Sequence, residues 1–289
     1  MRYTVRHNTE FTYTLPVISA QHVLQLKPRT LPGRQSLFSH TIDLSLGAEM
    51  SEHADYFGNA IYEVRLPVRH ESLQIETVSE LDVQPRDDIL LDLSPPWEQV
   101  RDTLSVPLSN EHWEAAQFCF PSPHIDPHAA AELAAAVVEP GMPLLRLADA
   151  LTRHIHAQFT YQGGVTDVHT PVADVLRSRM GVCQDFAHIA IAAFRQLGLS
   201  ARYVSGYILS QLDNRPALVG AEASHAWLSV YCSEFGWVDF DPTNNQLTSD
   251  QHIVLAWGRD YADVAPTRGS LLGGGTQLLN VDVQVRVKA

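Results

Sequence analysis

The chain has 289 residues, of which 45% are hydrophobic and 18% charged, so it can bury a sizeable core, and its length suits two ordinary domains. Its 20 Lys and Arg against 33 Asp and Glu give a net charge of −13 with no basic stripe, which argues against nucleic acid and anionic membranes as partners. No run approaches the roughly 18 apolar residues of a membrane span, and residues 1–15 lack the apolar segment of a signal peptide.

Three cysteines are spread along the chain, at Cys119, Cys183 and Cys232. They are too few and too far apart for a disulfide framework. An odd number of cysteines without a signal peptide is typical of reduced thiols. We therefore expect a cytoplasmic protein.

Residues 1–95 predict a β-rich domain. Apolar and polar residues alternate around Tyr3 and Val5, and again in the segments 22–27 and 60–66. Breaks that contain Gly or Pro separate these segments. This pattern is typical of an antiparallel sandwich or barrel with one solvated face.

Residues 96–125 contain several prolines and are predicted to be a connection to a second domain over 126–289. Within this second domain, the segments 129–138 and 144–159 have helical spacing. Near the end of the chain, valines alternate with polar residues over 281–287, which predicts a half-buried strand. Its pattern leaves open which domain the strand completes.

A helix is predicted to begin at Cys183. The run CQDFAHIAIAAFRQLG places apolar residues on one buried side, and Gly198 stands where a C-terminal cap belongs. A cysteine in the first turn of a helix meets the positive end of the helix dipole and unpaired backbone N–H groups. These favour thiolate over thiol and can stabilise an oxyanion. Gly181, just upstream, would let a substrate chain approach closely.

Two predicted strands follow, and they carry a histidine and two aspartates. In HAWLSVY the alternate apolar residues form one face, so His225 points to the other. The segment GWVDFD is the expected antiparallel neighbour. Asp239 and Asp241 face the same side of it, so periodicity does not choose which one orients His225 and which is a solvated strand residue. A cysteine, a histidine and an orienting carboxylate are the requirements of nucleophilic acyl transfer.

Three separated motifs carry a family resemblance. GVCQDFAHIAIAAFRQLGLSARYVSGYI, SHAWLSVY and GWVDFDPTNN resemble the bacterial branch of the transglutaminase-like superfamily, and GRDYADVAPTRG resembles a further segment of that branch. The resemblance is strong over residues 140–289. Residues 1–90 are similar, more weakly, to the β-rich N-terminal domain that precedes the core in these proteins.

The resemblance implies an α+β protein with a papain-like transglutaminase core, preceded by a sandwich-like N-terminal domain. In such a core, a helix that carries the nucleophile packs on an antiparallel sheet that carries the other two residues. Position by position, the nucleophile is then Cys183, the base His225 and the acid Asp241. One departure is Ser229, where relatives often have a glutamate. This departure leaves substrate preference and the polarity around the triad open.

The expected function is a cysteine-dependent amide-bond hydrolase, a peptidase or amidase, acting on a peptide or protein amide through a thioester. The alternatives are a transglutaminase, which passes the acyl group to an amine, and a non-catalytic binding scaffold. No cofactor and no metal are expected, because HExxH and CxxC pairs are absent and Gly273–Gly275 lacks the context of a phosphate loop. Trp227 and Trp237 suit a cleft wall or the core equally well.

Overall fold

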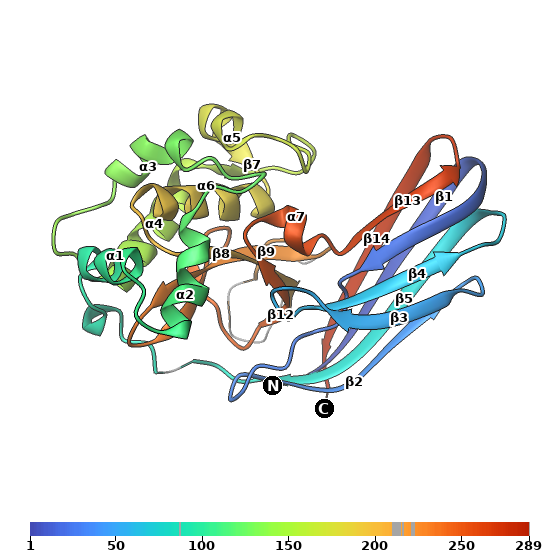
Figure 1. Cartoon of the computed structure of the whole chain (residues 1–289), viewed down its shortest axis with the longest axis horizontal. Helices are drawn as coiled ribbons and strands as arrows, with labels where there is room; N and C mark the ends of the chain where they lie inside the picture. Colours follow the sequence, from blue (N-terminus) through green and yellow to red (C-terminus); the bar gives the residue numbers. More distant parts are fainter. Residues whose placement is uncertain (87, 210–214, 216, 221–222, 289) are drawn as a thin grey trace.

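The computed structural model describes residues 1–86, 88–209, 215, 217–220 and 223–288. Helices gather at one end of the molecule, and long strands extend from the other (Figure 1). The strands are β1 (Arg2–Leu24), β2 (Gln35–Leu44), β3 (Glu49–Ala54), β4 (Ala60–Leu66), β5 (His70–Val83), β6 (Thr160–Tyr161), β7 (Met180–Gly181), β8 (Ala201–Ile208), β9 (His225–Cys232), β10 (Gly236–Asp241), β11 (Gln246–Leu247), β12 (His252–Gly258), β13 (Thr267–Gly273) and β14 (Gln277–Val287). The helices are α1 (Trp97–Ser105), α2 (Asn110–Ala116), α3 (Ala131–Ala135), α4 (Leu144–Gln158), α5 (Val172–Ser178), α6 (Cys183–Gln196) and α7 (Tyr261–Val264), with short 3-10 helices at Leu91–Leu93, Gln117–Cys119 and Pro127–Ala130.

The N-terminal region is a seven-stranded sheet built around β1, as the alternation of its residues predicts. The strand order is β2-β5-β1-β4-β3, and β13 and β14 also pair with β1. The first half of β1 pairs with β5 and β14, the second half with β4 and β13, and the register to β5 shifts between Thr12 and Val17. Both halves contribute to one hydrophobic cluster, which includes Phe11, Leu24 and Ile75. The region is therefore one sheet bent onto a sandwich-like core.

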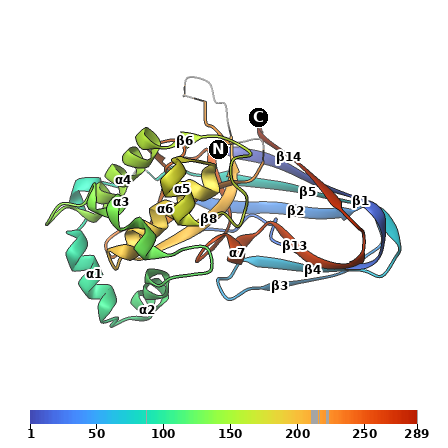
Figure 2. The ribbon, with the colours of Figure 1, turned by 90° about the horizontal axis from the view of Figure 1, so that it is seen from above.

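The final hairpin of the chain completes this N-terminal sheet. β14 pairs antiparallel with β1 from Tyr3 to Tyr13, and β13 pairs with its second half. Figure 2 shows β13 and β14 extending away from the helices, as β1 does. Gly273–Gly275, which join β13 to β14, all have positive φ, a conformation that favours glycine. The pairing answers the question that the valine pattern left open: β13 and β14 belong to the sheet of residues 2–83, and not to the domain that was predicted over 126–289.

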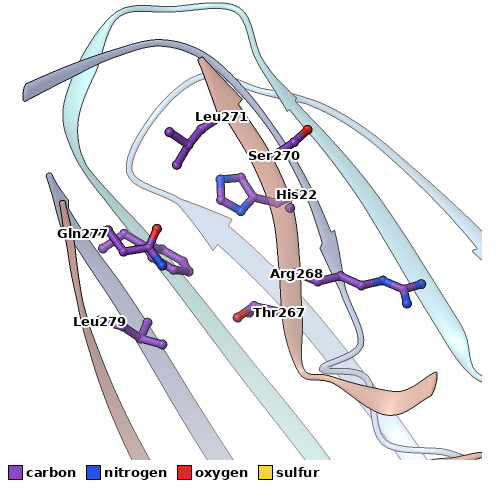
Figure 3. A pocket seen from close by; sticks show the side chains of 9 residues that line it. His22, Thr267, Arg268, Ser270, Leu271, Gln277 and Leu279 are labelled. Atoms are coloured by element: carbon purple, nitrogen blue, oxygen red, sulfur yellow. The ribbon is translucent and has the colours of Figure 1, made fainter. Parts of the chain in front are cut away.

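A small cavity lies between β1 and the final hairpin (Figure 3). Its volume is about 130 Å³, and its lining includes His22, Leu271, Gln277 and Leu279. This volume holds only a few water-sized molecules.

The second region has the predicted arrangement of a helix packed on an antiparallel sheet. The strand order is β11-β10-β9-β8-β12, with every neighbouring pair antiparallel. Ala226, Leu228 and Val230 of β9 share one buried cluster with the apolar side of α6. None of the described helices is long and apolar enough to cross a membrane. The α+β, papain-like fold class is confirmed.

Residues 96–125 contain more helix than their prolines indicate. They form α1 and α2, and Val100, Leu104 and Ala115 enter the same core cluster as α6. The segment is therefore part of the helical layer as well as a connection. In contrast, the predicted helix at 129–138 is shorter than its spacing suggests, because only Ala131–Ala135 is α-helical.

The two regions are joined along the outer edge of β12. The side-chain amide of Gln35 donates to Val254 O at 2.8 Å and accepts from Val254 N at 2.9 Å. Asn59 makes the same pair of bonds to Trp257, at 2.8 and 3.0 Å. Two side-chain amides thus satisfy backbone groups that an edge strand would otherwise leave open. Tyr3 and other residues of the first sheet also enter the core cluster of the second region.

Candidate active site

Cys183 stands in the first turn of α6, where the sequence places it. The backbone before it is extended at Val182, whose N–H donates to the Asp185 carboxylate at 2.8 Å. Thr166 Oγ1 donates to the same carboxylate oxygen at 2.6 Å. The Cys183 residue is 9% exposed, so only a narrow approach to its sulfur is open.

Gly181 has a structural role at the start of α6. A Cβ at this position would lie 2.7 Å from Asp185 Oδ2 and 2.8 Å from Asp185 Cβ. Gly181 therefore leaves room for the carboxylate that caps the helix. The approach of a substrate chain at Gly181 stays a prediction.

His225 and Asp241 come together at one end of the sheet. His225 is the first residue of β9 and Asp241 the last of β10, and both are buried. His225 Nε2 lies 2.9 Å from Asp241 Oδ2. The structure thus brings Asp241, and not Asp239, to the histidine ring.

Because Nε2 is bonded to Asp241, Nδ1 is the ring nitrogen of His225 that is left for the adjacent Cys183 sulfur. Burial by itself opposes a charge on the ring, but the Asp241 carboxylate and the adjacent Cys183 sulfur outweigh it and raise the pKa of His225 to about 10. His225 Nδ1 makes no hydrogen bond of good geometry to any described residue. It is therefore free to exchange a proton with Cys183.

Asp241 receives five hydrogen bonds. Its Oδ1 accepts from the backbone N–H groups of Thr243 and Asn244, at 2.9 and 3.2 Å. Its Oδ2 accepts from Asn244 Nδ2 at 2.7 Å, and His252 Nε2 lies 3.2 Å from it, in addition to His225. Burial would favour the neutral acid, but the His225 charge and these donors hold the pKa of Asp241 well below its usual range. Sequence reasoning missed both Asn244 and His252.

Gly220 lies against the His225 ring. A Cβ added to Gly220 would be 2.8 Å from His225 Nδ1 and 3.5 Å from the Tyr161 hydroxyl. Asn244 holds the preceding residue: Val219 N donates to its Oδ1 at 2.8 Å, and its Nδ2 donates to Val219 O at 3.2 Å. One side chain therefore links Val219 to the carboxylate behind His225.

Asp239 is a buried ion-pair partner, not a solvated strand residue. It is 5% exposed, and Arg34 Nη2 donates to its Oδ2 at 3.1 Å. Burial alone would raise the pKa of Asp239, but Arg34 and Arg202 lower it. Arg34 comes from the N-terminal region, so this pair also joins the two regions.

Ser229 lies directly between these charges. In the sheet its neighbours are Asp239 on β10 and Arg202 on β8. The site where relatives often have a glutamate is thus next to a carboxylate supplied by the adjacent strand. Trp237 packs on the Arg202 guanidinium, whose central carbon lies 4.1 Å from the centre of the Trp237 ring. Trp227 is a core residue with no exposed surface.

The other cysteines lie in different surroundings. All three cysteines are free thiols. Burial raises the pKa of Cys119 to about 11, against a smaller opposite effect of Arg195, and burial also raises the pKa of Cys232. Across the described ranges, no three His, Cys, Asp or Glu side chains converge to hold a metal ion.

A helix-borne cysteine beside a His–Asp pair on an antiparallel sheet defines a papain-like core of the transglutaminase type. Residues 131–242 match the family model of the transglutaminase-like superfamily, and residues 3–82 match the bacterial transglutaminase-like N-terminal region. The chain belongs to the transglutaminase-like superfamily.

Relatives and solved structures extend over nearly the whole chain. An uncharacterized protein of Mycobacterium bovis is 36% identical, covering 99% of this chain and 92% of its own. One of Mycobacterium leprae is 28% identical, with 98% of each chain covered. The crystal structure of a Cytophaga hutchinsonii protein, itself proposed to be a cysteine protease, superimposes with a TM-score of 0.78 over 99% of this chain and 90% of that chain, at 22% identity. At this identity the likeness concerns the fold.

Proposed function

We propose that this protein is a cysteine-dependent hydrolase of peptide or protein amide bonds, with Cys183 as nucleophile, His225 as acid and base, and Asp241 orienting the ring. The observation that carries this proposal is the buried His225, whose Nε2 is held by Asp241 while Nδ1 is left for the adjacent Cys183 sulfur. Nucleophilic acyl transfer requires this arrangement. The Cytophaga hutchinsonii protein with the same fold has been proposed to be a cysteine protease.

The reaction proceeds in two halves. The Cys183 thiolate attacks the amide carbonyl carbon, and the first N–H groups of α6 stabilise the oxyanion. The C–N bond then breaks as His225 gives its Nδ1 proton to the leaving amine, which leaves a thioester and a neutral ring. In the second half, neutral His225 takes a proton from water, the resulting hydroxide adds to the thioester, and the acid departs as the thiolate and protonated His225 re-form.

Hydrolysis and transfer to an amine differ only in the second half. An amine in place of water would form a new amide, which is the transglutaminase reaction. We favour water as acceptor, because Cys183 is 9% exposed and Gly220 closes on His225, and water fits this narrow approach better than an amine side chain. We also propose a reducing, cytoplasmic environment, which suits a catalytic thiol.

The test is incubation with a peptide library, with and without a primary amine, read by mass spectrometry. Hydrolase activity predicts cleaved or deamidated peptides in both conditions. Cross-linked products that need the amine would support the transglutaminase reaction instead. Cys183→Ala should abolish turnover, and Cys119→Ala is the matched control that should retain it. A screen in which the wild type and Cys183→Ala give the same products would reject the enzyme.

A second test needs no substrate. Limiting iodoacetamide should label Cys183 before the other two cysteines, because only its sulfur has a histidine partner and burial raises the pKa of the others. Peptide mapping identifies the labelled position. Preferential labelling of Cys119 or Cys232 would contradict the assignment of the nucleophile.

A further inference from the structure

A second histidine reaches the carboxylate of the proposed triad. His252 begins β12, is buried, and places Nε2 3.2 Å from Asp241 Oδ2. Its ring packs edge-on against Trp227, with ring centroids 5.4 Å apart. His225 and His252 thus approach the same carboxylate oxygen through the same kind of nitrogen.

The local turn fixes the tautomer of His252. Ser249 N donates to His252 Nδ1 at 3.2 Å, so this nitrogen is an acceptor and carries no proton. The proton of the neutral ring is then on Nε2, which donates to Asp241. A proton on His252 Nδ1 would point at the N–H of Ser249, and two donors would then face each other. His252 Nε2 is therefore a hydrogen-bond donor to Asp241.

The N-terminal region holds the strand that carries His252. Two residues beyond it, Val254 is bonded to Gln35 through both its N–H and its carbonyl. Just before it, the carbonyl of Asp250 accepts from the Tyr3 hydroxyl at 2.8 Å. Both ends of the His252 segment are therefore anchored on the first sheet of the protein.

We propose that His252 is a positioning residue of the active site, which holds the Asp241 carboxylate in the orientation that serves His225. This inference rests on the proposed function and deepens it. The turn after β10 already holds Oδ1 through two backbone N–H groups and Oδ2 through Asn244, and His252 adds the hydrogen bond that ties Oδ2, the oxygen beside His225, to β12. With Asp241 fixed, His225 keeps its charge beside the sulfur, and Cys183 stays reactive. The N-terminal region acts on the chemistry through β12.

The test compares His252→Phe with His252→Gln. The phenylalanine keeps an aromatic ring against Trp227 but cannot donate. The glutamine amide can donate to Asp241 from nearly the position of Nε2. If His252 only fills space, the phenylalanine should be the better substitute. If it positions Asp241, the glutamine should be.

The readout is the rate of Cys183 alkylation by iodoacetamide at pH 7, in protein whose folding is checked by circular dichroism. We expect His252→Phe to be slower than wild type by about tenfold to a hundredfold, which is the value of one hydrogen bond to a charged group, and His252→Gln to stay within a few fold of wild type. Asp241→Ala is the reference for full loss of orientation. A His252→Phe variant as reactive as wild type, beside a slow Asp241→Ala, would overturn the positioning role and leave the proposed function intact.

Failure of the proposed function gives a different result. In that case wild-type Cys183 itself would react no faster than Cys119, and the inference about His252 would fall with it. Should His252→Phe not fold, His252→Asn takes its place, because its amide is too short to reach Asp241. Alkylation of the asparagine and glutamine variants at equal rates would then overturn the positioning role.

Discussion

Gly220→Ala tests how tightly Gly220 fits against the His225 ring. The added methyl carbon would lie 2.8 Å from His225 Nδ1, whereas ordinary contacts begin at 3.4 Å. The ring must therefore move by roughly half an ångström. Since a misplacement of about 1 Å can cost about a hundredfold in rate, we expect about a tenfold loss. Gly220 also has a φ of +94°, so alanine adds backbone strain of about 1–2 kcal/mol.

Gly236→Ala is the matched control for this strain. Gly236 has a φ of +65°, but no heavy atom lies within 4 Å of an added Cβ. Both variants should lose similar free energy of unfolding in urea, and only Gly220→Ala should slow turnover and Cys183 alkylation. The reasoning is refuted if both variants react equally fast, or if Gly236→Ala is slowed as much as Gly220→Ala.

Three further predictions concern buried groups. Asp239→Ala should lower the free energy of unfolding by about 3–5 kcal/mol, because it leaves Arg34 and Arg202 without their acid. The control is Asp82→Ala, which removes a partly exposed carboxylate and should change the free energy of unfolding little. Equal urea midpoints for the two variants would contradict this prediction. Gln35→Ala removes both hydrogen bonds to Val254 and should lower the free energy of unfolding by about 2–6 kcal/mol, since each backbone group left unpaired costs about 1–3 kcal/mol. An unchanged urea midpoint would show that the backbone groups at the edge of β12 find other partners. Turnover should stay level to pH 9 and fall as the pH rises through about 10, because the raised pKa of His225 keeps the folded ring charged up to that pH. The stability that this charge contributes is present in full below the ordinary pKa of 6.5 and is lost progressively as the pH rises to about 10. An alkaline fall of turnover near pH 7 would mean that Asp241 does not act on His225.

The parts of the site that depend on local pattern could be predicted from the sequence. The helix that begins at Cys183 follows from apolar spacing, and its end follows from Gly198, which has a φ of +73° in the structure. The strands of His225 and Asp241 follow from alternation and a short turn. Periodicity left Asp239 and Asp241 equivalent, and the family motif, rather than any physical argument, selected Asp241.

The parts that depend on the assembled sheet could not be predicted. β9 and β8 lie between β10 and β12 in the strand order, so no pattern along the chain brings His252 to Asp241. The burial of Asp239 is set by Arg34, far away in the first sheet. No sequence pattern marks Gly220 either, because the need for glycine there comes from the nearness of the His225 ring in the folded protein.

The pairing of β1 with the final hairpin has a consequence for biosynthesis. β1 leaves the ribosome first, and β13 and β14 come last among its partners, roughly ten seconds or more later at usual rates of translation. During that interval, one side of β1 exposes unpaired N–H and C=O groups along most of its length. Two nascent chains on one messenger can then exchange their hairpins, and the interlocked dimer would retain every strand pairing of the monomer. Slow release from the ribosome, or crowding of chains during overexpression, should therefore increase the proportion of such exchanged dimers.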